Sequence, residues 1–114
     1  MNQLKELLTN YKARSAWSKG VKAFAFDLLE NLEGRAINKE NLLNGASDWS
    51  QYSYGGCAFI YDQDIAEHLS TPSELKSRKG GDWQPSKQET WLDVQARALG
   101  QACSLILRLN RKAK

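Results

Sequence analysis

The strongest signal for the fold lies in residues 86–110, which read SKQETWLDVQARALGQACSLILRLN. Ser86 and Glu89 have the spacing of a capping box, in which a hydroxyl and a carboxylate close the first turn of a helix. Apolar side chains then recur every three to four positions along one broad face: Trp91, Leu92, Ala98, Leu99, Ala102, Leu105, Ile106 and Leu109. The stretch therefore predicts one long amphipathic helix that the rest of the chain surrounds.

The first third of the chain predicts two more helices. The apolar residues between Leu4 and Tyr11 repeat at helical spacing, which indicates a short first helix. Ser15 is placed to cap a longer second helix, and Gly34 is suited to end it. The core-facing positions of this second helix are Trp17, Val21, Phe24, Leu28 and Leu32.

The middle of the chain is harder to assign. Asn38 is placed to cap a third, short helix, but periodicity fails in residues 45–56, where we expect a last helical turn followed by a loop at Gly55-Gly56. The apolar run 57–61 fits either a buried strand or the start of a helix. A lone strand would have no partner, so helical or extended packing is favoured. Residues 62–79 then predict two short helices joined by a tight turn.

These patterns predict an all-α, single-domain bundle of about five helices around a long C-terminal helix. The chain has 114 residues, 41% of them hydrophobic and 25% charged, which is typical of one globular domain with its own core. The residues expected to form that core are Trp17, Phe24, Leu28, Ile65, Leu69, Trp91, Leu99, Ala102 and Ile106.

Composition also argues against several classes of protein. The net charge of +3 is low for a dedicated nucleic-acid binder, although residues 108–114 form a basic tail. Two cysteines without a CxxC pair and a single histidine exclude a zinc finger, so Cys57 and Cys103 are expected to be buried and reduced. The N-terminal residues carry charges and no long apolar run, which predicts a cytoplasmic protein that has no membrane span. No cofactor motif is present in the sequence.

A few residues break the helical pattern. Gln95 falls within the apolar arc of the long helix, where a buried amide needs hydrogen-bond partners, so it either tethers a loop such as 47–56 or lines a pocket. Phe26 lies on an otherwise charged face, so it either packs under a neighbouring element or contacts a partner. Asp64 and His68 are four residues apart and share a helix face. Two such groups are too few for a metal site, so a surface contact between them is favoured.

Three segments together resemble a known group of proteins. They read YSYGGCAFIYDQDIAEHL, PSELK and ETWLDVQARALGQA. They look like a group of small uncharacterised bacterial proteins that are often carried on mobile elements, over roughly residues 44–109. The resemblance implies a bacterial origin linked to a phage or plasmid. It implies no activity, cofactor or site residue.

The favoured functional hypothesis is a non-enzymatic binding module that acts through contacts with a protein partner or as a homo-oligomer. Aromatic residues are enriched at interface hot spots, and the chain has more of them than its core needs. The candidate contact residues are Phe26, Trp49, Tyr52, Tyr54 and Trp83. An enzyme would have to rely on carboxylates such as Asp62 and Asp64, and no catalytic constellation surrounds them.

The second hypothesis is a DNA-binding or DNA-associated accessory protein. Residues 62–79 are similar to a helix-turn-helix, although the turn is one residue short and Ser70-Thr71 replaces the usual glycine and apolar pair. The basic tail adds further positive charge. The candidate DNA-contacting residues are Ser73, Lys76, Ser77, Arg78, Lys79, Arg108, Arg111, Lys112 and Lys114.

Overall fold

The computed structural model describes residues 2–32, 34–53, 60–69 and 90–113. These ranges form the helices α1 (Asn2–Asn10), α2 (Ala16–Leu32), α3 (Lys39–Ser53), α4 (Asp62–Ala66) and α5 (Trp91–Ala113). No strand occurs within them. The prediction of an all-α bundle around a long C-terminal helix is therefore confirmed. None of the described helices is both long enough and apolar enough to span a bilayer.

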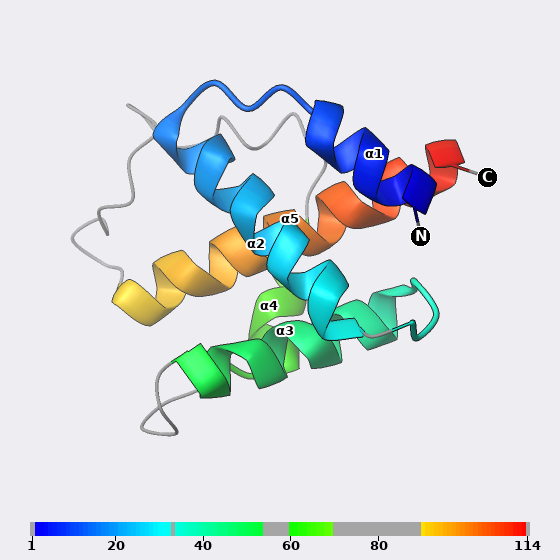
Figure 1. The fold of residues 1–114 in the computed structure, drawn as a ribbon. Coiled ribbons are helices and arrows are strands. Elements are labelled where there is room, and N and C mark those ends of the chain that lie inside the picture. The colour runs from blue at the N-terminus through cyan, green and yellow to red at the C-terminus, as the bar shows by residue number, and fades with distance from the viewer. Residues whose placement is uncertain (1, 33, 54–59, 70–89, 114) are drawn as a thin grey trace.

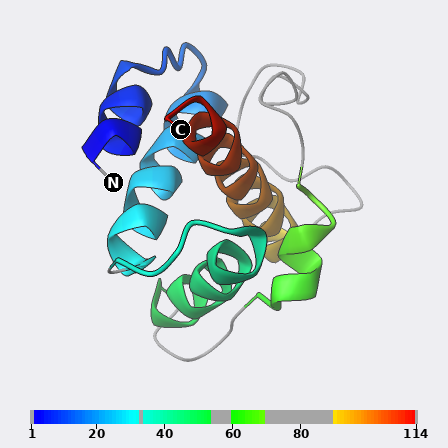
Figure 2. The ribbon, with the colours of Figure 1, turned by 90° about the vertical axis from the view of Figure 1, so that its right-hand side faces the viewer.

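The long helix α5 runs through the middle of the bundle. Figure 1 shows α2 crossing it and α1 lying beside its C-terminal half. Figure 2 looks nearly along α5 and shows the other four helices arranged around it. Every residue from Ala98 to Cys103 is buried, because neighbouring helices cover this part of α5 on all sides. The small residues at this level let those neighbours come close.

Most of the predicted core is confirmed. Six of its members are buried: Trp17, Leu28, Ile65, Leu99, Ala102 and Ile106. Phe24 and Leu69 are partly buried and pack against this core. Trp91 was assigned wrongly, because its side chain is 55% exposed. The helical period places Trp91 on the apolar face, but the first turn of α5 lies at the edge of the bundle, where that face is only partly covered (Figure 1).

Two predicted caps are confirmed. The amide of Ser18 donates to Ser15 Oγ at 3.0 Å, which closes the first turn of α2. The amide of Asn41 donates to Asn38 Oδ1 at 2.8 Å, which closes the first turn of α3. Gly34 follows α2 with a φ of +85°, a left-handed conformation that glycine adopts without strain and that commonly ends a helix.

The start of α5 differs from the prediction. The helix begins at Trp91 rather than at Ser86, and Ser86 and Glu89 lie outside the described residues. Its capping box is made by Thr90 and Asp93 instead: the Asp93 amide donates to Thr90 Oγ1 at 3.2 Å, and the Thr90 amide donates to Asp93 Oδ2 at 2.8 Å. A threonine followed three residues later by an aspartate forms the same reciprocal cap as the predicted pair.

Candidate functional site

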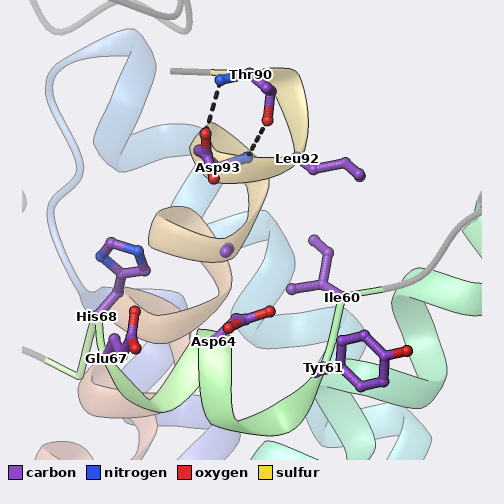
Figure 3. Close-up of a pocket in the computed structure, with 9 residues that line it drawn as sticks. Ile60, Tyr61, Asp64, Glu67, His68, Thr90, Leu92 and Asp93 are labelled. Atoms are coloured by element: carbon purple, nitrogen blue, oxygen red, sulfur yellow. Dashed lines mark hydrogen bonds between the residues drawn. The ribbon is translucent and has the colours of Figure 1, made fainter. Parts of the chain in front are cut away.

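A groove opens between α4 and the first turns of α5 (Figure 3). Its volume is about 360 Å³. Its lining comes from two stretches of the chain that are far apart in sequence: Ile60, Tyr61, Asp64, Glu67, His68, Thr90, Leu92, Asp93 and Ala96. We call it the α4–α5 groove. It is the best candidate for a binding site among the described residues because apolar and charged side chains converge on it.

Hydrogen bonds to α3 fix one side of the groove. The amide of Ile60 donates to Ser50 Oγ at 2.8 Å, and Ser47 Oγ donates to the carbonyl of Ile60 at 2.6 Å. Ser50 is buried, so its hydroxyl satisfies a backbone group that water does not reach. These bonds hold the residue that leads into α4, and thereby position Tyr61 and Asp64 at the edge of the groove.

Close packing of two backbones fixes the base of the groove. A Cβ atom built on Gly100 of α5 would lie 2.7 Å from the carbonyl oxygen of Ile65 and 2.7 Å from His68 Cβ. Only a residue without a side chain allows this approach. Gly100 therefore lets the end of α4 lie directly on α5, with Ile65 buried between them and His68 at the groove.

The described lining of the groove is acidic. It contains the carboxylates of Asp64, Glu67 and Asp93 and no lysine or arginine. The remaining titratable side chains in this lining are those of His68 and Tyr61. Figure 3 shows Asp64 on α4 and Asp93 on the facing turns of α5. Since aspartate and glutamate carry negative charge at neutral pH, the groove presents a negative surface to an incoming ligand.

Two exposed apolar side chains line the groove, and a third is their neighbour in the sequence. Among the described residues, the exposed large hydrophobic side chains are Tyr61 at 55%, Trp91 at 55% and Leu92 at 38%. Tyr61 and Leu92 line the groove, and Trp91 precedes Leu92 in the same helical turn. Exposed apolar residues that gather at one place mark interaction surfaces more often than scattered ones do. We call these three residues the apolar rim.

The apolar rim does not appear among the candidates taken from the sequence. Trp91 and Leu92 were assigned to the buried face of the long helix, and Tyr61 to an apolar run that packs inward. The pattern Thr90-x-x-Asp93 was the signal that could have found two of them. It starts the helix at Trp91, which puts Trp91 and Leu92 in a first turn, where coverage by neighbouring helices is incomplete.

Asp64 lies on α4 and His68 lies beyond its end at Ala66, so the two do not share one helix as predicted, although both line the groove. Asp64 is exposed and His68 is half-buried. Within the ranges that the structure describes, no three His, Cys, Asp or Glu side chains come together in a way suited to a metal ion.

The predicted aromatic contact residues do not form one surface in the described part of the chain. Phe26 and Trp49 are half-buried and pack against the core. Trp49 meets Phe24 edge to face, with ring centroids 4.8 Å apart, and also borders a second hollow next to Asp27 and Glu30. Tyr52 belongs to α3, but its side chain, Tyr54 and Trp83 lie outside the described residues.

The predicted DNA-contacting residues fall into two groups. Ser73, Lys76, Ser77, Arg78 and Lys79 lie outside the described residues, as does Lys114. Arg108, Arg111 and Lys112 are exposed on the last two turns of α5, and we call them the basic end of α5. Of the helix-turn-helix-like segment, the structure describes 62–69, where α4 is only five residues long and Asp62, Asp64 and Glu67 supply negative charge.

The buried amide of α5 is Gln101 rather than Gln95. Gln95 is half-buried, whereas Gln101 is buried at the centre of the bundle. The indole N–H of Trp17 donates to Gln101 Oε1 at 2.7 Å, and Arg97 Cζ lies 5.0 Å from the centroid of the Trp17 ring. This arrangement satisfies the polar atom of a buried tryptophan and tethers α2 to α5, which is a structural role.

Cys103 is a buried free thiol, as predicted, while Cys57 lies outside the described residues. Burial raises the pKa of Cys103 from 9.0 to about 12. The thiol therefore stays protonated in the folded protein at neutral pH, and the protonated form is a poor nucleophile.

We expect Cys103 to resist alkylation until the protein unfolds. In a Cys57→Ser variant, which leaves Cys103 as the one thiol of the chain, labelling of the folded protein with iodoacetamide at pH 8 should be roughly a thousandfold slower than labelling in urea. The raised pKa also means that the protonated thiol stabilises the fold below about pH 9 and that this contribution is lost as the pH rises toward 12. Rapid labelling of the folded variant would contradict the burial.

Comparisons of the chain with protein-family models, with curated proteins and with solved structures found no match. The resemblance to bacterial proteins of mobile elements stays a prediction.

Proposed function

We propose that this protein is a non-enzymatic binding module whose α4–α5 groove takes a cationic segment of a partner protein. The observation that carries the proposal is the apolar rim at a groove lined by Asp64, Glu67 and Asp93. We also place the protein in the cytoplasm, where the free thiol of Cys103 stays reduced.

The chemistry of the groove suits lysine and arginine side chains. Both have a long aliphatic stem that can lie along Leu92, and a charged head that can reach the carboxylates of Asp64 and Glu67. The exposed ring of Tyr61 offers an additional attraction for a cation. Because most of this surface is open to water, binding should be weak, fast and sensitive to salt.

DNA association is the second candidate function. The observation in its favour is the exposed basic end of α5, which could contact phosphates. The acidic side chains of Asp62, Asp64 and Glu67 would repel phosphates from the described part of the helix-turn-helix-like segment. A gel shift with duplex DNA that is lost in an Arg111→Glu/Lys112→Glu variant would favour this candidate over the protein-binding module.

Charge reversal in the groove tests the proposed function. In an Asp64→Lys/Glu67→Lys variant, affinity for a fluorescent peptide rich in lysine and arginine should fall by at least about tenfold, because two attractive contacts become repulsive. Fluorescence anisotropy at low salt measures the binding. A glutamate-rich peptide of the same length should not bind the parent protein.

The matched control is Asp48→Lys. Asp48 is an exposed carboxylate on α3 that does not line the groove, so this variant changes the net charge and leaves the binding surface intact. It should bind the cationic peptide nearly as well as the parent. If the control loses as much affinity per charge as the groove variant, the peptide is attracted by overall charge and the groove is not the site. Circular dichroism checks that both variants remain helical.

A further inference from the structure

The charges on α5 are divided between its two ends. Its first turns border the acidic α4–α5 groove, through Leu92 and Asp93. Its last two turns carry Arg108, Arg111 and Lys112, all exposed. Figure 1 shows these two ends on opposite sides of the molecule. One chain thus presents both an acidic groove and a cationic helix end.

The basic end of α5 cannot reach the groove of its own chain. α5 has 23 residues, so a helix of this length extends about 34 Å from its first turn to its last. This distance is several times the reach of an arginine side chain, and α5 is held straight through the core of the bundle. A contact between the two surfaces therefore has to join two copies of the chain.

The two surfaces are complementary in more than charge. Leu107 packs against the core and is partly exposed, and it lies one helical turn before Arg111 on the same side of α5. The basic end thus combines an apolar side chain with cations, as the groove combines Leu92 with carboxylates. Three exposed cations face a lining with three carboxylates, so docking would pair opposite charges without leaving one sign in excess.

We propose that the groove takes the basic end of α5 from a second copy of this chain, so that the protein associates head to tail. The proposal rests on the proposed function and names its partner. The contact is heterologous, because one copy contributes its groove and the other contributes the basic end of its α5. Such contacts form open chains of copies, or rings if the geometry closes.

Sedimentation velocity of the nuclease-treated protein tests this proposal. At low salt, the sedimentation coefficient should rise with protein concentration and continue beyond a dimer. High salt should shift the concentration needed for association upward by at least about tenfold, because exposed charge pairs are screened. This measurement uses the unaltered protein and does not depend on the folding of any variant.

A charge exchange between two variants identifies the surfaces. The first variant is Arg111→Glu/Lys112→Glu, and the second is Asp64→Lys/Glu67→Lys. Each variant alone should be monomeric, because its tail and its groove now have the same sign. An equimolar mixture should associate again, because each acidic surface then meets a basic one. As a control, Asp48→Lys keeps both surfaces, so this variant should associate on its own as the unaltered protein does.

The outcomes separate this proposal from the proposed function. An unaltered protein that stays monomeric at low salt but binds the cationic peptide overturns head-to-tail association and leaves the groove as a binding site. An unaltered protein that neither self-associates nor binds the cationic peptide overturns both the head-to-tail association and the proposed function. Self-association that persists in both double variants, or a mixture that stays monomeric while the unaltered protein associates, shows that other surfaces join the copies and overturns the proposal.

Discussion

Replacing Trp17 with alanine is expected to destabilise the protein by about 3–5 kcal/mol, the cost typical of removing a large buried aromatic side chain. Trp17 is a residue of α2, and its side chain is fully buried where α2 packs against α5. Its truncation leaves a cavity against the central helix, and it also removes the indole donor to Gln101 and the ring beneath Arg97. Urea unfolding followed by circular dichroism measures the change.

A double-mutant cycle separates the hydrogen bond from the packing of Trp17. Trp17→Phe retains an aromatic ring but removes the indole donor, and Gln101→Leu removes the acceptor. We expect the two changes together to cost less than the sum of the single changes, with a coupling of about 0.5–3 kcal/mol. Strict additivity would show that the 2.7 Å contact contributes nothing to stability. A cost below about 1 kcal/mol for Trp17→Ala would contradict the tight packing of this site.

Gly100→Ala is expected to destabilise the protein by about 1–3 kcal/mol, the range for overpacking a dense core. Alanine favours a helix interior over glycine by up to about 1 kcal/mol, so propensity alone predicts the opposite sign. The added methyl group would lie 2.7 Å from the carbonyl oxygen of Ile65 and from His68 Cβ, so α4 has to move away from α5. Because His68 lines the groove, weaker peptide binding should accompany the loss of stability.

Gly45→Ala is the matched control for this prediction. Gly45 lies in the interior of α3 and is also buried, but a Cβ atom built on it meets its nearest neighbours, Asn31 Nδ2 and Leu32 Cδ2, at 3.9 Å. That is ordinary contact, so the helix propensity of alanine should stabilise the protein by up to about 1 kcal/mol. Thermal unfolding of the two variants side by side gives the signs. Equal responses would mean that the backbones of α4 and α5 do not approach as closely as the structure indicates.

Much of the fold was predictable because helical periodicity and capping are local. Ser15 and Asn38 were identified as caps, and the apolar repeat from Trp17 to Leu32 marked α2 correctly. The length of α3 was underestimated: a short helix and one further helical turn before Gly55-Gly56 were expected, whereas α3 runs as one helix from Lys39 to Ser53. The burial of Ala46 and Ser50 in contact with the rest of the bundle outweighs the weak intrinsic preference of that sequence for a helix.

Burial along α5 was predicted less well because periodicity does not show how many sides of a helix are covered. In the middle of α5 even the polar side chain of Gln101 is buried, whereas in its first turn Trp91 is exposed. The position of the groove likewise depends on how the helices pack together, which periodicity does not show. The spacing of Asp64 and His68 suggested one helix face, but α4 ends at Ala66. Their proximity to Leu92 and Asp93, which follow them by more than twenty residues, is a property of the tertiary packing.

The central position of α5 has a consequence for the order in which the chain folds during synthesis. α1, α2, α3 and α4 all pack against α5, which is the last of the described helices to leave the ribosome. Until then, the apolar faces of the earlier helices lack the surface that covers them, and short isolated helices are marginal in water. The nascent chain should therefore remain largely unassembled and accessible to chaperones until α5 emerges, and then collapse around that helix in one cooperative step.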